Sequence, residues 1–228
     1  MFRLSVTSCQ VIALFTFVTV LTDPVGAAST GDSEAAYTQD ITKRADKILA
    51  TLGITDDAAK SRVRDLLIQQ YRTLREIHAA RDAKLAEVKH GQPADPAVAE
   101  AWVKTARDAA NLKLADVHRR FVARLSVELS PEQVDKVKDG LTYGVVGVTY
   151  KRYLELFPEL KDEQKREILA NLVEARDLAM DAGSSEEKHA VFGKYKGRIN
   201  NYLSAAGYDM RRAEKDLAEK QKARSAQR

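Results

Sequence analysis

Two long stretches of helix-forming residues, 56–90 and 96–128, restrict the fold of this chain more than any other feature of its sequence. When successive residues are placed about 100° apart, the main apolar residues of the first stretch fall within one stripe. They are Val63, Leu66, Leu67, Leu74, Ile77, Leu85 and Val88. A Gly-Gln-Pro sequence at 91–93 interrupts the pattern, and long helices joined by so few residues pack antiparallel. No run alternates apolar and polar residues as strands do. The sequence therefore predicts an all-α fold, a bundle of about five to six helices that contains a long antiparallel helical hairpin.

Shorter helices are expected in the rest of the chain, over residues 131–157, 162–182 and 185–206. Residues 209–228 are charged and contain few apolar side chains, which predicts a solvated or frayed helix. The sequence thus divides into three parts. They are a signal peptide over 1–27, a single helical domain over 28–208 and a charged C-terminal tail over 209–228.

The helix expected from residue 131 begins with the residues of a complete capping box. Ser130 suits the N-cap, Pro131 suits the first helical position, and the Gln133 side chain can reach back to the N-cap backbone. Leu129 can pack on Val134 as a hydrophobic staple. We therefore expect this helix to begin at Pro131.

The first 28 residues have the layout of a secretory signal. Arg3 precedes a charge-free apolar run over residues 11–21, and small residues follow at 25–28. The run is shorter than the roughly 20 residues that a membrane-spanning helix needs. We therefore expect cleavage after Ala27 or Ala28, a periplasmic or secreted protein, and no stable membrane insertion after cleavage.

Cysteine content and charge narrow the class of protein further. Cys9 is the only cysteine and would leave with the signal peptide, so the mature chain must fold without a disulfide. The net charge is +4, and residues 209–228 hold seven Lys or Arg against four Asp or Glu. A weakly basic tail is a poor electrostatic footprint for nucleic acid, so we expect no nucleic-acid partner. The oligomeric state is left open by the sequence.

Residues 139–209 differ from the rest in holding seven of the eleven glycines and six of the eight tyrosines. The expected helix 131–157 is apolar on two sides, with glycines between them, which is typical of a central helix that a neighbour approaches closely. Tyr143, Tyr150 and Tyr153 have two interpretations. They either pack in the core or form the aromatic wall of a cleft, since tyrosine offers a ligand a flat face and a hydroxyl.

The expected helix 185–206 carries a dense set of hydrogen-bond donors away from its apolar stripe. These donors suit an anionic or hydroxyl-rich ligand, and they equally suit an ordinary solvent-exposed helix face. If the helices 131–157 and 185–206 pack closely, the tyrosines and the donors would share a partly open pocket. The predicted ligand-binding residues are Tyr143, Tyr150, His189, Lys194, Arg198 and Asn201.

Three strings of the sequence resemble an uncharacterised family of exported bacterial helical proteins. They are YTQDITKRADKILATLGI near the front, DKVKDGLTYGVVGVTY at 135–150 and AGSSEEKHAVFGKYKGRINNYLSAAGYD at 182–209. The family is a domain of unknown function, loosely described as sugar-binding and often met beside polysaccharide-degrading systems. The resemblance implies an all-helical fold and a saccharide ligand, and it carries over no catalytic or binding residue.

Three similar helix starts give a second, local resemblance. Residues 54–57, 129–133 and 160–164 resemble the Leu-Thr-x-x-Gln starts of the Spy-like periplasmic chaperones, which are helical cradles for unfolded clients. Lys161 replaces the hydroxyl residue in one start, and Ala58 replaces the Gln in another. Such a start is also a favourable way to begin any helix.

The classical catalytic and metal-binding motifs give no positive prediction. The sequence has no Gly-x-Ser-x-Gly, phosphate loop or dinucleotide fingerprint. Two Glu-x-x-His strings at 87–90 and 186–189 have the spacing of di-iron ligands, but both lie at helix ends. We expect no metal and no cofactor. His78 and His118 stand alone in the sequence and are expected to be partly buried or surface residues.

Three functions from different classes are compatible with these features. The leading hypothesis is an exported, non-enzymatic binding protein for a saccharide or another hydroxyl-rich small molecule. The first alternative is an ATP-independent chaperone of the Spy type, which would require an exposed apolar face. The second alternative is a glycan-processing enzyme that uses paired carboxylates such as Asp139 and Glu186, although no spacing singles out that pair.

Overall fold

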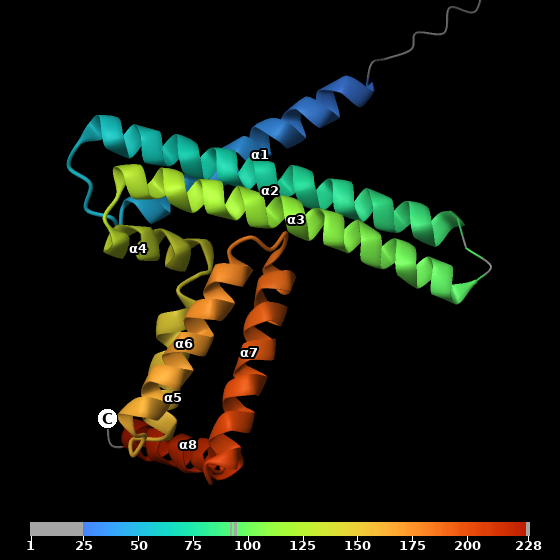
Figure 1. Cartoon of the computed structure of the whole chain (residues 1–228). Helices are drawn as coiled ribbons and strands as arrows, with labels where there is room; N and C mark the ends of the chain where they lie inside the picture. The colour runs from blue at the N-terminus through green and yellow to red at the C-terminus, as the bar shows by residue number, and fades with distance from the viewer. Residues whose placement is uncertain (1–24, 92, 94, 227–228) are drawn as a thin grey trace, which may run out of the picture. The chain divides into compact units, whose positions relative to one another are not determined.

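The structure, a computed structural model, describes residues 25–91, 93 and 95–226 (Figure 1). Within these residues all regular secondary structure is helical, which confirms the predicted fold class. The eight helices described are α1 (Val25–Leu49), α2 (Asp57–Gly91), α3 (Pro96–Glu128), α4 (Pro131–Leu141), α5 (Val145–Leu156), α6 (Asp162–Ala179), α7 (Ser185–Ala205) and α8 (Met210–Ala226). None of these helices is long and apolar enough to cross a membrane.

The chain forms two units, residues 1–37 and 38–228. The described part of the first unit is the beginning of α1, and the contacts below belong to the second. Residues 1–24 of the predicted signal peptide lie outside the described residues. Cleavage and export therefore stay predictions.

Eight described helices exceed the expected five to six for three local reasons. Helix α1 precedes the predicted hairpin, the segment 131–157 forms two helices instead of one, and the predicted tail forms α8. In α8, Met210, Ala213 and Leu217 pack against apolar residues of the neighbouring helices. The charged C-terminal segment thus contributes one apolar face to the domain.

The break between α4 and α5 lies at Tyr143 and Gly144, which both have left-handed backbone conformations with φ of 60° and 67°. The Gly144 N–H donates to the carbonyl oxygen of Asp139 at 2.8 Å, which closes the end of α4. The three glycines that the sequence places between the two apolar sides of the segment 131–157 have separate roles. A Cβ at Gly140 would lie 2.6 Å from the Ile48 side chain, Gly144 makes the turn, and Gly147 faces open space.

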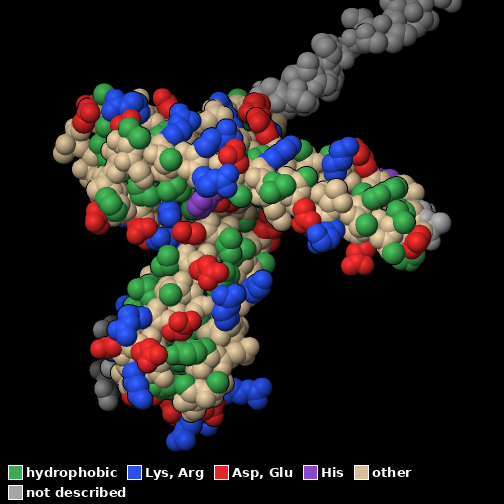
Figure 2. All heavy atoms as spheres, viewed as in Figure 1, with side chains coloured by type: hydrophobic (Ala, Val, Ile, Leu, Met, Phe, Trp, Pro, Cys, Tyr) green, Lys and Arg blue, Asp and Glu red, His purple; other side chains and the backbone are tan. Residues whose placement is uncertain are grey.

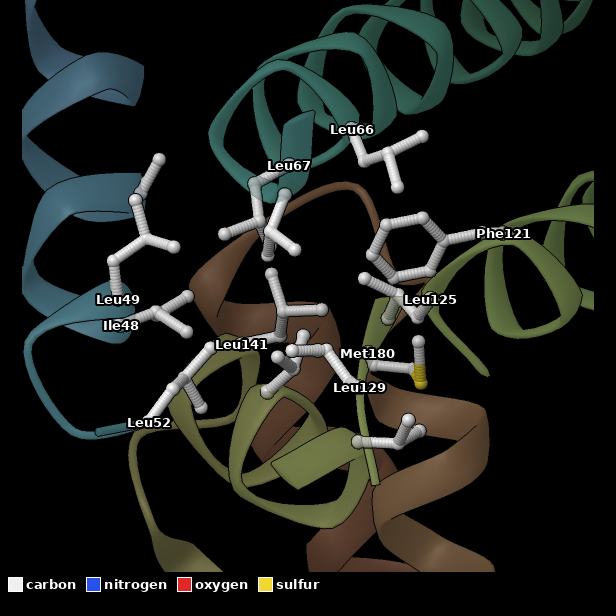
Figure 3. Packing of buried hydrophobic residues seen from close by; sticks show 14 residues of the cluster. Ile48, Leu49, Leu52, Leu66, Leu67, Phe121, Leu125, Leu129, Leu141 and Met180 are labelled. Atoms are coloured by element: carbon white, nitrogen blue, oxygen red, sulfur yellow. The ribbon is translucent and has the colours of Figure 1, made fainter. Parts of the chain in front are cut away.

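Helices α2 and α3 lie side by side as the long hairpin that the sequence predicts (Figure 1). The first half of α2 and the last half of α3 enclose the first hydrophobic cluster together with α1 and α4. Figure 3 shows Leu67, Phe121, Leu125 and Leu141 converging there. The predicted stripe of α2 is buried as far as Leu74 and only partly covered beyond it.

A second cluster joins α5, α6, α7 and α8. Its fully enclosed members include Ile168, Leu172, Phe192, Ile199 and Leu203. On the outside, Figure 2 shows Lys and Arg side chains interspersed with Asp and Glu over the visible face. The two apolar clusters account for the fold, which leaves exposed or unusually buried polar groups as the candidates for a functional site.

The capping box at the start of α4 is formed as predicted. The Gln133 N–H donates to the Ser130 hydroxyl at 3.3 Å, and the Ser130 N–H donates to the Gln133 side-chain oxygen at 3.0 Å. Leu129 and Val134 are both buried, as a hydrophobic staple requires. The helix begins at Pro131, where the sequence placed it.

Replacing Ser130 with alanine is expected to lower the free energy of unfolding by about 1 kcal/mol, because one N-terminal amide of α4 loses its acceptor. Urea unfolding followed by circular dichroism measures this change. Ser130→Asp keeps an acceptor at the N-cap and should remain close to the parent protein. A Ser130→Ala midpoint equal to that of the parent would contradict the prediction.

Candidate functional site

Two of the predicted ligand-binding residues meet at the break between α4 and α5. The rings of Tyr143 and His189 are stacked, with centroids 6.5 Å apart and planes 17° from parallel. The Lys188 Nζ atom lies over the same Tyr143 ring, 5.5 Å from its centroid. The turn after α4 therefore packs on the first part of α7.

The other four predicted residues lie apart from Tyr143. Arg198 follows His189 by nine residues on α7, about 13 Å along the helix axis, and its guanidinium lies over the Tyr195 ring at 4.5 Å. Tyr150 is partly buried and packs against the second cluster, which agrees with the core interpretation. Lys194 and Asn201 are exposed on α7. Tyr143 and His189 are thus in contact, whereas the other four have different neighbours, and a binding role for all six residues stays a prediction.

Tyr143 instead lines an open pocket of about 660 Å³ between α1, α2 and α4. Three cationic side chains border it, namely those of Arg44, Lys47 and Lys136. Its less polar wall includes Ile48, Tyr71 and Tyr143. We refer to this cavity as the Tyr143 pocket.

The charge of the Tyr143 pocket is predominantly positive. Its one acidic lining residue is Asp139, whose carboxylate accepts a hydrogen bond from the Arg176 guanidinium at 3.0 Å. Arg44 pairs with Asp40 at 2.8 Å, but both side chains are more than half exposed, so solvent screens that pair. The pocket therefore favours ligands with oxygen acceptors or negative charge.

Tyr143 itself has two unusual properties. Its side chain is 54% exposed, so the ring is not needed to fill the core. Its backbone has φ of 60°, a left-handed conformation that costs a residue with a Cβ about 1 kcal/mol. Strain of this kind tends to be kept at functional sites, which makes Tyr143 the main candidate for ligand contact.

Lys188 is a buried cation beside this pocket. Its side chain is folded inward, and Nζ donates to the backbone carbonyl oxygen of Leu141 at 2.7 Å. Burial and, to a smaller extent, the positive charge of Arg44 lower the pKa of Lys188 to about 8, against the opposing charge of Asp181. Sequence reasoning missed Lys188 because its position next to His189 gave no sign that the side chain is buried.

A second polar cluster joins residues that appeared isolated in the sequence. His118 Nδ1 lies 2.6 Å from the Asp181 carboxylate, and His78 Nε2 lies 2.7 Å from the Asp181 backbone oxygen. Gln70 donates to the other carboxylate oxygen at 3.4 Å. The hydrogen bond to Asp181 raises the pKa of His118. His78, His118 and Asp181 border a cleft of about 860 Å³ between the hairpin and the α6–α7 pair.

His78 could have been noticed in the sequence because it follows Leu74 by four residues on the apolar stripe of α2. Its partner could not, since Asp181 is 103 residues away. A Cβ at Gly183 would lie 2.6 Å from the His78 ring, so the chain between α6 and α7 fits closely over the imidazole. The cluster therefore holds this connection against α2 and α3.

The residues suggested for catalysis or metal binding have other partners. Asp139 is bonded to Arg176, whereas Glu186 is exposed in the first turn of α7. In the first Glu-x-x-His string, Glu87 pairs with Lys84. His189 Nδ1 lies 2.7 Å from the Ser185 carbonyl oxygen. The described residues contain no group of three or more His, Cys, Asp or Glu that could hold a metal ion.

The half of the hairpin formed by the end of α2 and the beginning of α3 carries an apolar groove of about 590 Å³. Trp102 lines it and is 51% exposed, and Ile77, Val88 and Ala109 form part of its floor. Exposed apolar surface of this kind is typical of places where proteins contact other molecules. We refer to it as the distal groove.

Comparison with known proteins identifies a family but no function. A family model described as "Protein of unknown function (DUF3826)" matches residues 38–223. No curated protein matches the chain. The family match supports the expected resemblance to a domain of unknown function. The sugar-binding description and the likeness to Spy-like chaperones stay predictions.

Proposed function

Because the chain belongs to the DUF3826 family of proteins of unknown function, we propose from its geometry that it is an exported, non-enzymatic binding protein for a saccharide or another hydroxyl-rich small molecule. The observation that carries the proposal is the half-exposed Tyr143 ring, held by a left-handed backbone in the wall of a 660 Å³ pocket. The size of this pocket is within the range of small-molecule sites.

The chemistry of the lining fits such a ligand. The flat face of Tyr143 can stack on the apolar face of a sugar ring, while Lys47 and Lys136 can donate to hydroxyl or ring oxygens. Thr51 adds a hydroxyl to the lining, although that group donates to the Ile48 carbonyl at 2.7 Å. An aromatic wall with a rim of donors matches the usual composition of polar small-molecule sites.

A non-enzymatic role is favoured by the state of the acidic group in the pocket. Acid–base hydrolysis of a glycoside needs two carboxyl groups that flank the scissile bond. The pocket lining supplies only Asp139, and Arg176 holds that carboxylate in a hydrogen bond. Binding without turnover is therefore the simpler function for these residues.

Isothermal titration against a panel of plant and host oligosaccharides tests the proposal. At least one glycan should bind the parent protein, and Tyr143→Ala should weaken that binding about 30-fold through loss of the stacking face. Trp102→Ala is the matched control, because it removes an exposed aromatic residue outside the pocket. The proposal fails if no glycan gives heat, or if Tyr143→Ala binds as the parent does while remaining folded.

The distal groove favours a second candidate, an ATP-independent chaperone of the Spy type. An apolar groove beside the exposed Trp102 ring could hold an unfolded segment of a client. Aggregation of a reduced client at near-stoichiometric ratio would then be suppressed, and Trp102→Ala would weaken the suppression while Tyr143→Ala would not. Equal aggregation with and without the protein would remove this candidate.

A further inference from the structure

Lys188 is the buried cation closest to the proposed ligand site, and its charge is poorly compensated. The whole residue is only 9% exposed, and within the described residues its ammonium has no carboxylate in salt-bridge contact. The Lys188 ammonium donates to the Leu141 carbonyl oxygen at 2.7 Å and lies over the face of the Tyr143 ring. A buried ammonium without a counter-ion is costly, since neither partner carries a full negative charge.

The charged groups around Lys188 come from several elements. Arg44 of α1 adds a like charge, and His189 of α7 is stacked on the same Tyr143 ring. Asp181, between α6 and α7, is the acidic group that acts on Lys188, but its carboxylate is bonded to His118 at 2.6 Å. Burial and the charge of Arg44 together outweigh the attraction of Asp181.

The side of Tyr143 that opens to the pocket is also positive. Lys188 and His189 contact the ring without lining the pocket, whereas Arg44, Lys47 and Lys136 line it. Lys188 therefore lies over the Tyr143 ring, and three further cationic side chains line the pocket that the ring borders. The one carboxylate in the lining belongs to Asp139, which Arg176 already engages.

We infer that the ligand of the Tyr143 pocket carries an anionic group, such as a carboxylate or a sulfate ester, and that its binding is coupled to proton uptake by Lys188. The inference rests on the proposed function and narrows its ligand class from hydroxyl-rich to acidic saccharides. The anion adds negative charge to a lining that has three cationic residues and one carboxylate, which Arg176 already engages.

The proton coupling follows from electrostatics. With the pKa of Lys188 lowered to about 8, about half of these amines are neutral at pH 8. A nearby anion favours the charged form of the amine and so raises its pKa. Each binding event at pH 8 should then take up as much as about half a proton from the buffer.

Calorimetric titration at pH 8 with matched charged and neutral ligands tests the inference. Trigalacturonate is compared with its fully methyl-esterified form, and a sulfated disaccharide with its unsulfated parent, each in two buffers of different ionisation enthalpy. The acidic member of a pair should bind about tenfold more tightly, equivalent to about 1.4 kcal/mol. Its apparent enthalpy should depend on the buffer, and its affinity should fall as salt is added.

Substitutions of Lys188 assign the effect to that residue. Lys188→Met should abolish the dependence on buffer and reduce the preference for the acidic ligand. Lys188→Arg should restore the preference without the proton uptake, because a guanidinium stays charged at pH 8. Lys215→Met removes an exposed lysine of α8 and serves as the control. Thermal melts of all variants show whether each one is folded.

The outcomes separate this inference from the proposed function. If no glycan of either kind binds, the proposed function fails, and the inference fails with it. If the neutral and acidic members of each pair bind equally, or if binding of the acidic member takes up no proton, the proposed function stands and the inference is overturned. Proton uptake that persists in Lys188→Met would also overturn it, because another group would then be titrating.

Discussion

Replacement of Arg176 by methionine is expected to destabilise the protein by about 2 to 3 kcal/mol. Arg176 is 5% exposed, and its guanidinium bonds Asp139 at 3.0 Å and Asp135 at 2.7 Å. A third carboxylate, from Asp177, approaches Nε at 3.5 Å. Without the guanidinium, three carboxylates remain close together without their common cation.

The size of the effect depends on how well water replaces the lost partner. Breaking a fully buried ion pair costs about 3 to 5 kcal/mol. The three aspartates are between 37% and 59% exposed, so water solvates them in part once the guanidinium is lost. We therefore expect a loss of stability below the range for a fully buried pair. Methionine keeps most of the buried volume, which separates the loss of charge from the creation of a cavity.

Urea unfolding at pH 7 and low salt measures the change. Arg198→Met is the matched control, since Arg198 pairs with Glu174 at 3.3 Å but both side chains are more than half exposed. It should cost less than about 1 kcal/mol. If the two variants unfolded at the same urea concentration, the three aspartates would not depend on Arg176. Adding Asp139→Asn to Arg176→Met should recover part of the loss, because one repelling charge is removed.

Replacement of Tyr143 by glycine is expected to separate stability from binding. Glycine adopts positive φ without a steric penalty, so the 60° conformation no longer carries strain. The lost ring is 54% exposed, so the core loses little apolar contact. We expect Tyr143→Gly to be at least as stable as the parent and to bind the glycan about 30-fold more weakly.

Tyr143→Ala supplies the control, because both variants lack the ring and only alanine retains the Cβ that disfavours positive φ. Tyr143→Gly should therefore be more stable than Tyr143→Ala by about 1 kcal/mol, read from paired urea titrations. Equal binding losses in the two variants would assign the affinity to the ring. A Tyr143→Gly protein less stable than Tyr143→Ala would show that the left-handed turn is not strained.

Features that depend on neighbours along the chain could be read directly from the sequence. The stripe from Val63 to Leu74, the hairpin and the capping box at Ser130 are all formed as predicted. Each depends on helical periodicity or on backbone donors within about one turn, and these are local properties. The break at 143–144 was missed because three glycines at 140, 144 and 147 fit a close-packed helix face as well as they fit a turn.

Tertiary structure alone decided which polar residues meet. Tyr143 and His189 were predicted together and are stacked, but Arg198 lies further along α7, because only the first part of that helix reaches the turn after α4. Lys188 became a buried cation through the packing of α1, α4 and α7. His78 and His118 became partners of Asp181 because α2 and α3 cross over the α6–α7 connection. Helical periodicity fixes the face of a helix on which a residue lies. Which faces meet depends on how helices distant in sequence cross, and only the packed core determines that crossing.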